Sequence, residues 1–220
     1  MIIAIDGPAG AGKSTVARML ADQLSMGYLD TGAMYRAVAL LALTHGVDCE
    51  DQAALVAGLA AHTLDFHPRP GGIVITMDGR EVDQQIRSTE VTAHVSLVAA
   101  HPEIREIITG AQRRVLGGGS WVCDGRDIGT TVCPSAELKV FLSASARERA
   151  RRRCVELNAA GVAANIDEVR AAIEQRDHLD ITRNASPLRA ADDARHLDTS
   201  DQPINEVVAT IAGWAREVGV

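Results

Sequence analysis

A glycine-rich segment near the start of the chain constrains its fold more than any other feature. The sequence G-P-A-G-A-G-K-S at residues 7–14 fills every position of the pattern G-x-x-x-x-G-K-[ST], directly after an apolar run at residues 2–5. Apolar residues then recur at helical spacing as far as Leu24, and Gly27 follows as a stop signal. A strand, a glycine turn and a helix N-terminus in this order bring backbone N–H groups together around phosphate oxygens, whereas a plain turn needs neither the lysine nor the helix. The segment therefore predicts a nucleoside triphosphate site.

Composition and charge narrow the class of protein. The 220 residues are 46% hydrophobic and 23% charged, which is the makeup of one globular domain. We see neither the ~20-residue apolar stretch of a membrane span nor a signal peptide. A net charge of −7 argues against general binding to nucleic acid. The four cysteines are scattered and lack zinc spacing, so we expect reduced thiols and a cytoplasmic location, with no membrane or nucleic-acid partner.

Strand-like and helical patterns alternate along the chain. The short apolar segments that favour strands cover residues 2–5, 27–29, 121–123, 138–142 and 195–197. The helical patterns cover residues 13–25, 33–44, 51–61, 89–99, 102–115, 145–158, 166–178 and 204–218, and an alanine-rich loop is expected at 159–164. This alternation predicts an α/β fold with a parallel sheet covered on both faces.

Residues 64–86 interrupt the alternation. Prolines and glycines precede a strand-like run at 73–77, and Asp78-Gly79 separates that run from residues 80–82. Asp-Gly between two such runs is a hairpin signal. We expect a small antiparallel insertion, which suits either a mobile lobe over a substrate or an ordinary surface hairpin.

A second motif, Y-L-D-T-G-A-M-Y-R at residues 28–36, follows the second expected strand. Thr31 is well placed to cap the helix that begins there. Tyr35 and Arg36 lie on the first turns of that helix, near the edge of the sheet where α/β folds bind ligands. Arg36 either pairs with a second phosphate or lies in solvent, and the motif alone leaves both readings open.

A third motif, W-V-C-D-G-R-D-I-G at residues 121–129, ends a buried strand in Asp124. A carboxylate in this position often orients Mg²⁺ through its water shell in P-loop enzymes. The glycines of the motif let the backbone turn tightly and leave Arg126 and Asp127 facing a ligand. A D-G turn that merely ends the strand is the alternative.

Arginines are dense in the last third of the chain. Those that share one face of an expected helix are Arg149, Arg152 and Arg153. They form either a solvated surface or a group that neutralises charge on a transferring phosphate. A second face carries Arg176, Asp180 and Arg183, which mix both signs as a ribose and phosphate site needs. The histidines form no triad or metal-ligand pattern, so the only metal that we expect is Mg²⁺ with the nucleotide.

Together these motifs resemble those of the bacterial cytidylate kinases, a family of P-loop nucleoside monophosphate kinases. The matching segments, in the family's order, are I-D-G-P-A-G-A-G-K-S-T at 5–15, L-D-T-G-A-M-Y-R at 29–36, I-R-S-T-E-V at 86–91, C-D-G-R-D-I-G-T at 123–130, E-R-A-R-R-R at 148–153 and R-D-x-x-D-x-x-R at 176–183. The first segment is shared widely. The pair D-T-G-A-M-Y-R and D-G-R-D-I-G is far more specific.

The resemblance implies a P-loop three-layer α/β fold with a five-stranded parallel core, in a single domain over residues 1–220. It also implies a hairpin-containing insertion that binds the nucleoside monophosphate, at about residues 31–105, and a short lid at about 148–165. The implied reaction transfers the γ-phosphoryl group of ATP, bound with Mg²⁺, to CMP or dCMP in pyrimidine nucleotide metabolism. We expect the chain to be a monomer.

Carried over by position, the resemblance assigns the ATP site. The residues expected to bind ATP are Gly7, Pro8, Ala9, Gly10, Ala11, Gly12, Lys13, Ser14 and Thr15. Among them, Lys13 would bridge the β- and γ-phosphates and Thr15 would support the α-phosphate. Mg²⁺ would be held by Ser14 and Asp124.

The resemblance assigns the acceptor site in the same way. The residues expected to bind the acceptor are Thr31, Tyr35, Arg36, Ser96, Arg105, Arg126, Asp127, Arg176, Asp180 and Arg183. Ser96, Arg105 and Asp127 would read the cytosine edge, and Arg176 and Asp180 would reach the ribose. The residues expected to act in catalysis are Lys13, Arg36, Arg126 and Arg183.

Two other classes of protein could use the same glycine-rich loop. A small-molecule kinase acting on shikimate, dephospho-coenzyme A or another nucleotide is the nearest alternative. A switch GTPase or a motor ATPase is a more distant one, because the base-reading motif N-K-x-D is absent and L-G-G-G-S at 116–120 only superficially resembles the transporter motif L-S-G-G-Q. The degree of UMP tolerance and the strictness for ATP stay open.

Overall fold

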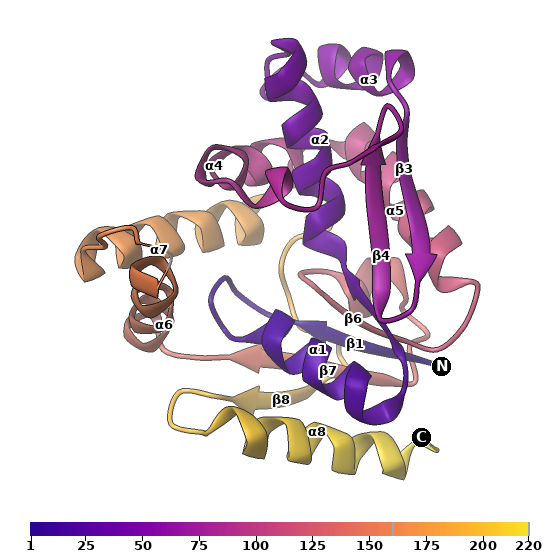
Figure 1. The fold of residues 1–220 in the computed structure, drawn as a ribbon. Coiled ribbons are helices and arrows are strands. Elements are labelled where there is room, and N and C mark those ends of the chain that lie inside the picture. Colours follow the sequence, from indigo (N-terminus) through magenta and orange to yellow (C-terminus); the bar gives the residue numbers. More distant parts are fainter. Residues whose placement is uncertain (160, 220) are drawn as a thin grey trace.

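A central sheet of five parallel strands organises the molecule, which is described over residues 1–159 and 161–219 in a computed structural model (Figure 1). The strand order is β2-β6-β1-β7-β8. The strands are β1 (Ile2–Asp6), β2 (Gly27–Asp30), β6 (Trp121–Gly125), β7 (Leu138–Ser143) and β8 (Arg195–Asp198). All five lie where the apolar runs predicted them, so the expected parallel core is confirmed.

Helices cover both faces of this sheet. Ile3 and Ile5 of β1 pack with α1 (Lys13–Leu24) and α8 (Ile204–Glu217), whereas Ala4 between them packs with α2 (Thr31–His45) and α5 (Pro102–Leu116). This alternation follows from the pleat, which turns successive side chains to opposite faces. Figure 1 shows the resulting layers, and the expected three-layer α/β fold is confirmed.

Two further helices lie beyond the carboxyl edge of the sheet. They are α6 (Ala146–Ala159) and α7 (Ile166–Thr182), which pack against each other at the left of Figure 1. A small apolar cluster of Ala9, Ala150 and Ile173 joins them to the glycine-rich loop. The loop expected at 159–164 separates the two helices, although Ala160 lies outside the described residues. The second helix continues four residues past its predicted end at 178.

The segment between α2 and α5 forms a separate group of elements at the top of Figure 1. It contains α3 (Gln52–Ala61), β3 (Leu64–Arg69), β4 (Gly72–Met77), β5 (Arg80–Glu81), a 3-10 turn (Gln85–Arg87) and α4 (Thr89–Val98). The turn at Asp78-Gly79 joins β4 to β5, as predicted. Strand β3 was not expected, because Pro68 cannot donate to a ladder, but it pairs only with β4 and Pro68 is tolerated on this edge strand.

Two helix boundaries differ from their predicted signals. Helix α1 ends at Leu24 with Ser25 in the left-handed conformation (φ 55°), while Gly27 already belongs to β2 and packs against the Trp121 ring. The cap of α2 is not Thr31 but Asp30, whose carboxylate accepts a hydrogen bond of 2.9 Å from the Ala33 N–H. In both cases a residue near the predicted one makes the hydrogen bonds that cap the helix, because the predicted residue has another contact.

In the part of the chain that the structure describes, no helix has both the length and the apolar character needed to cross a membrane.

Close packing requires glycine at position 125, where β6 ends. A Cβ added there would lie 2.6 Å from Thr31 Oγ1 and 2.7 Å from Ile128 Cδ1. Its backbone does not have a positive φ, so the constraint comes from space and not from the tight turn that the motif predicted.

We therefore predict that Gly125→Ala lowers the free energy of unfolding by about 1–3 kcal/mol, because the added methyl overpacks the strand end. The matched control is Gly213→Ala in α8, where an added Cβ meets nothing within 4 Å and alanine favours the helix by about 1 kcal/mol. Urea unfolding measures both variants. Equal losses of stability would contradict the prediction.

Candidate active site

The glycine-rich loop connects β1 to α1 and wraps around the helix N-terminus. A Cβ on Gly7 would lie 2.0 Å from the Leu142 carbonyl oxygen, and Gly12 has a φ of 87° directly before the helix. These two glycines therefore set the course of the loop. The first N–H groups of an α-helix have no carbonyl partner within the helix. The N-terminus of α1 is therefore suited to an anion.

Lys13 opens α1 and is almost completely buried. Its Nζ donates a 2.6 Å hydrogen bond to the Pro8 carbonyl. Burial and the nearby Arg126 guanidinium lower the pKa of Lys13 well below its usual range. A cation that is desolvated and repelled in this way gains stability when an anion approaches.

A buried ion pair between α6 and α7 holds the backbone of the glycine-rich loop in place. Arg149 Nη1 donates to the Ala9 carbonyl at 2.8 Å, and the Ala9 N–H donates to Asp177 Oδ1 at 2.9 Å. Arg149 and Asp177 also pair directly. The arginine thus holds the loop backbone, a role that the arginine-dense pattern did not suggest.

The other arginines expected beside it have different surroundings. Arg152 pairs with Glu148 and donates to the Thr199 carbonyl, whereas Arg153 is exposed and pairs with Glu156. For Arg153 the structure agrees with the solvated surface, one of the two readings that the arginine pattern left open, because its side chain is turned to solvent.

Carboxylates gather where the central strands end. Asp30 and Asp124 are register partners on β2 and β6. Asp124 accepts hydrogen bonds from Ser14 Oγ at 2.6 Å and from Tyr28 Oη at 2.9 Å. Burial and the negative charge of Asp30 raise the pKa of Asp124. A hydroxyl and a desolvated carboxylate in contact are a donor set that suits Mg²⁺, which takes oxygen ligands.

The start of α2 faces this strand end. Thr31 Oγ1 donates to the Asp124 carbonyl at 2.7 Å, and Arg36 Nη2 donates to Asp30 Oδ2 at 2.7 Å. Arg36 is therefore held at the edge of the sheet and does not extend freely into solvent, the alternative that the motif had left open.

Opposite this edge, arginines and aspartates from three parts of the chain pair with one another. Arg105 of α5 pairs with Asp127 at 2.5 Å, and both side chains are buried. Arg126 Nε donates to Asp180 Oδ2 of α7 at 2.8 Å. Arg183 lies 3.6 Å from Asp127 and 3.7 Å from Asp180, so it joins the two pairs.

Several buried polar atoms in this region have no hydrogen-bond partner among the described residues. Those that belong to predicted acceptor residues are Tyr35 Oη, Arg36 Nε, Arg105 Nε, Arg176 Nε and Arg183 Nη2. An unpaired buried donor costs about 1–3 kcal/mol, so such groups rarely occur together unless a ligand satisfies them. Their grouping suits a polar ligand.

The charges of the same region repel one another. Burial lowers the pKa of Arg176 to about 10, and the positive charges of Arg126 and Arg36 add to the effect while Asp180 opposes it. Arg126 and Arg176 also act on Lys13. The region thus links the glycine-rich loop to the residues predicted to bind the acceptor through a set of partly buried cations, which suits polyanionic ligands.

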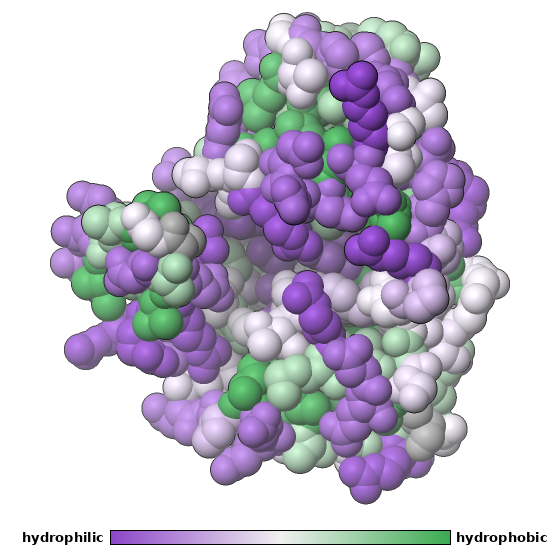
Figure 2. Space-filling model, in the orientation of Figure 1, coloured by the Kyte–Doolittle hydropathy of each residue, from purple (hydrophilic) through white to green (hydrophobic). Residues whose placement is uncertain are grey.

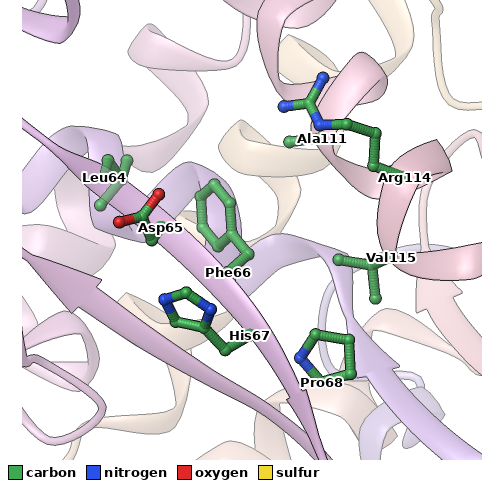
Figure 3. A pocket seen from close by; sticks show the side chains of 8 residues that line it. All are labelled: Leu64, Asp65, Phe66, His67, Pro68, Ala111, Arg114 and Val115. Carbon is green, nitrogen blue, oxygen red and sulfur yellow. The ribbon is translucent and has the colours of Figure 1, made fainter.

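The molecular surface has a hollow between the α6–α7 pair and the rest of the molecule (Figure 2). The side chains around this hollow are mostly hydrophilic. A cavity of about 200 Å³ lies elsewhere, between β3 and α5 (Figure 3). Its lining includes Phe66, Arg114 and Val115 and none of the predicted site residues.

Ser96 lies half-buried on α4, and its hydroxyl makes no hydrogen bond with residues 1–159 or 161–219. Its assignment to the cytosine edge stays a prediction.

Sequence reasoning missed Asp6, which ends β1. Its carboxylate accepts 2.8 Å hydrogen bonds from the N–H groups of Ile128 and Gly129, so it fixes the segment that carries Asp127. The same signal that singled out Asp124, a carboxylate directly after a buried strand, was present here. Burial raises the pKa of Asp6 to about 6, although the two N–H groups oppose the change.

Solved structures share the fold. A gluconokinase from Sinorhizobium meliloti 1021 has a TM-score of 0.50 at 15% sequence identity, covering 98% of this chain and 92% of that chain. At this identity the likeness concerns the fold alone. With the glycine-rich loop and its lysine, it defines the class as a P-loop α/β kinase fold.

Sequence comparison establishes the family. The family model described as cytidylate kinase matches residues 3–217. The cytidylate kinase of Listeria monocytogenes serotype 4a (strain HCC23) is 50% identical over 215 residues, covering 97% of this chain and 95% of that protein. The cytidylate kinase of Carboxydothermus hydrogenoformans is 50% identical over 211 residues, covering 96% and 95%. The chain belongs to the cytidylate kinase family of phosphotransferases, as its motifs predicted.

The raised pKa of Asp6 gives a prediction about stability. Between pH 4 and 6 the folded chain holds a proton on Asp6 that the unfolded chain has lost, so this group's contribution to stability falls as the pH rises through that window. Asp6→Asn removes the ionisation. We expect the unfolding free energy of the wild type, minus that of the variant, to decrease from pH 4 to pH 7 in urea titrations. A difference that does not change with pH would contradict this expectation.

Proposed function

We propose that this chain transfers the γ-phosphoryl group of ATP to CMP or dCMP, giving ADP and the corresponding nucleoside diphosphate. One observation carries the proposal: cationic side chains, several with a buried N–H that has no hydrogen-bond partner among the described residues, extend from Lys13 to the Arg105–Asp127 pair. A donor triphosphate, an acceptor phosphate and a base would satisfy these groups in that order.

On the donor side, residues 7–15 bind the phosphates of ATP. The helix N-terminus and the loop N–H groups face the phosphate oxygens, and Lys13 exchanges its bond to the Pro8 carbonyl for the β- and γ-phosphates. Thr15, exposed on the first turn, supports the α-phosphate. In this arrangement Lys13 places a compact positive charge beside the transferred phosphoryl group.

Ser14 and Asp124 form the metal site. Their oxygens lie 2.6 Å apart beside Lys13, and the desolvated Asp124 carboxylate is stabilised by a cation. When bound, Mg²⁺ neutralises charge on the phosphate oxygens of ATP. Ser14 supplies a hydroxyl, and Asp124 orients the water shell.

At the base, Asp127 and Arg105 provide opposite hydrogen-bonding character. Cytosine carries an amino donor where uracil carries a carbonyl, and a carboxylate accepts from that amino group. Arg105 is held by Asp127 and donates to the acceptor atoms of the ring. Ser96 is proposed as a third contact. Arg176 and Asp180 on α7 bind the ribose, with Arg183 beside them.

The acceptor phosphate needs no general base. Its second pKa is about 6, as for a phosphorylated side chain, so the attacking oxygen is already an anion near neutral pH. Arg36 and Arg126 bind this phosphate, and together with Lys13 and Arg183 they offset the charge that spreads over the transferred group. Catalysis then consists of positioning and electrostatic stabilisation.

Closure of the molecule completes the site. We assign residues 31–105, including Thr31 and Tyr35, to the part that binds the acceptor, and residues 148–165 to the lid. Because water competes with CMP for the γ-phosphoryl group, closing both over the substrates limits ATP hydrolysis. We further infer a monomer that acts in the cytoplasm, where the four unpaired thiols remain reduced.

A coupled assay across CMP, dCMP, UMP, AMP and shikimate, with identification of the products, tests this function. We predict that CMP and dCMP give the highest kcat/KM. The Lys13→Ala variant should lose at least about 100-fold in kcat while keeping the far-UV circular dichroism of the wild type, because an electrostatic contact to the transferred group is removed. Preference for AMP or shikimate, or a fully active Lys13→Ala variant, would overturn the proposal.

The base-reading role of Asp127 gives a separate prediction. Asp127→Ala should reduce the ratio of kcat/KM for CMP over UMP by roughly 10- to 100-fold, the value of one hydrogen bond to a charged group, with less effect on the KM for ATP.

Asp177→Ala is the matched control for this variant. It also leaves a buried arginine without its carboxylate, yet it lies on the loop side and should not alter the CMP-to-UMP ratio. If the control changes that ratio as much as Asp127→Ala does, the assignment of Asp127 to the base is wrong.

A further inference from the structure

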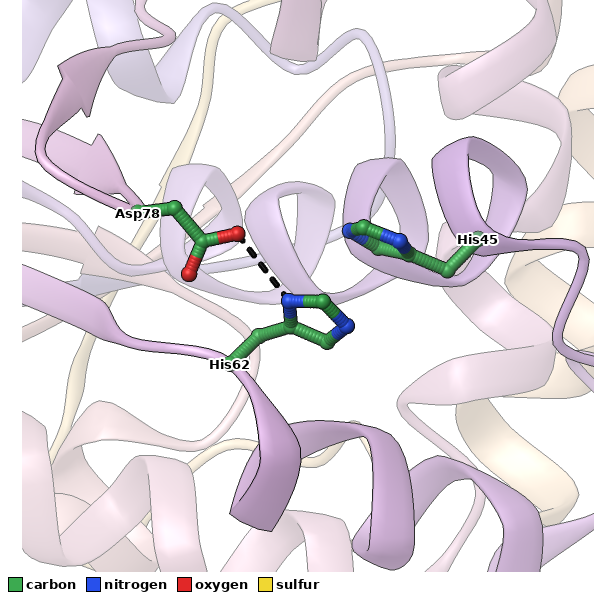
Figure 4. A group of neighbouring side chains, drawn as sticks. All are labelled: His45, His62 and Asp78. Carbon is green, nitrogen blue, oxygen red and sulfur yellow. Dashed lines mark hydrogen bonds and ion pairs between the residues drawn. The ribbon is translucent and has the colours of Figure 1, made fainter.

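Two histidines and an aspartate from three different elements meet at the far end of the part that contains α2, α3 and β4 (Figure 4). His45 is the last residue of α2, His62 follows the end of α3, and Asp78 lies in the turn between β4 and β5. One nitrogen or oxygen atom from each lies within 4.8 Å of the other two. The spacing of these residues in the sequence gave no metal-ligand pattern, because the cluster forms only in the folded chain.

The aspartate is fixed by its own backbone contacts. Asp78 Oδ1 accepts a 2.9 Å hydrogen bond from the Thr63 N–H, and the Asp78 N–H donates to the Thr63 carbonyl at 2.8 Å. This leaves Oδ2 directed at His62 Nδ1, at 3.0 Å. The Thr63 N–H and His62 lower the pKa of Asp78, so this carboxylate is ionised at neutral pH.

The two imidazole rings are stacked on each other. Their centroids lie 3.7 Å apart with an angle of 23° between the planes, and Figure 4 shows that His45 and Asp78 both face His62. The His45 side chain is exposed and makes no hydrogen bond with the described residues, so it can reorient at low cost. A Cβ added at Gly46 or Gly79, beside the cluster, would meet nothing within 4 Å, so a hydrated ion can approach.

We propose that His45, His62 and Asp78 bind a divalent transition-metal ion such as Zn²⁺, at a site separate from that of the catalytic Mg²⁺. Two imidazoles and one carboxylate are a ligand set that zinc favours and that magnesium, a hard cation, does not.

The existing distances suit such an ion. Zinc bonds of about 2.0–2.1 Å in tetrahedral geometry place neighbouring ligand atoms about 3.3 Å apart. The His62–Asp78 pair, at 3.0 Å, is close to that separation, and the ion replaces the proton shared by Nδ1 and Oδ2, which is released to solvent. A small movement of His45 adds the third ligand, and water completes the coordination.

Such a site would fasten three elements that meet at their ends. The end of α2, the end of α3 and the β4–β5 turn would share one ion. Because the unfolded chain lacks the preformed site, binding would stabilise the folded state. The inference does not depend on the proposed kinase reaction.

Zinc titration of the full-length chain tests the proposal. The protein is freed of metal by a chelator, exchanged into buffer with excess Mg²⁺, and titrated with ZnCl₂ in a calorimeter. We expect one Zn²⁺ per chain and an affinity that falls at least about tenfold in His45→Gln and in Asp78→Asn, which still accepts from Thr63. The control His67→Gln, an exposed histidine of β3 outside the cluster, should bind as the wild type does.

Thermal unfolding provides the second measurement. Zn²⁺ should raise the melting temperature of the wild type and of His67→Gln, and should leave His45→Gln and Asp78→Asn unchanged. Without zinc, His45→Gln should melt at the wild-type temperature and keep wild-type kinase activity, since it loses no hydrogen bond. The proposal is overturned if the wild type binds no Zn²⁺ in excess Mg²⁺, if His45→Gln retains its affinity, or if His67→Gln loses as much.

Discussion

The arrangement of the molecule depends on holding several positive charges close together in a partly desolvated region. Lys13 is buried, and the half-buried Arg126 and Arg176 lie close enough to lower its pKa, while Arg126 also lowers the pKa of Arg176. Desolvation and mutual repulsion would normally push such groups apart or neutralise them. The fold keeps them in place with aspartates, and the surplus of positive charge that remains is what a triphosphate and a monophosphate can neutralise.

The aspartates around these charges occupy two kinds of position. Asp6, Asp30 and Asp124 lie at or next to the ends of three neighbouring parallel strands, where the carboxyl edge of the sheet brings them together. Asp177 and Asp180 lie on successive turns of α7, on the other side of the glycine-rich loop. Each has a different partner. Asp6 bonds the backbone N–H groups of residues 128 and 129, Asp30 bonds Arg36, and Asp124 bonds Ser14 and Tyr28. Asp177 bonds Ala9 and Arg149, and Asp180 bonds Arg126. Because each of these carboxylates is engaged by the protein itself, the fold fixes their positions.

Local patterns in the sequence predicted most of the fold, and the structure brings most of the predicted site residues together where the central strands end. Apolar runs located the five core strands, and periodicity located the helices to within a few residues, because both signals arise from neighbours in the chain. Strand β3 was missed, since Pro68 disfavours a strand unless the strand lies at an edge, and an edge is a tertiary property. The brace of Arg149 on Ala9 and the cluster around His62 were missed for a similar reason. Their partners are distant in sequence, and only the folded chain brings them together.

Helix α7 is shared by the two halves of the site. Asp177 holds the backbone of the glycine-rich loop through Ala9, while Arg176 and Asp180, one residue before it and three after it, face the acceptor side. A rigid helix cannot shift at one of these contacts without shifting at the other. The position of the loop backbone and the positions of Arg176 and Asp180 are therefore set together by one element.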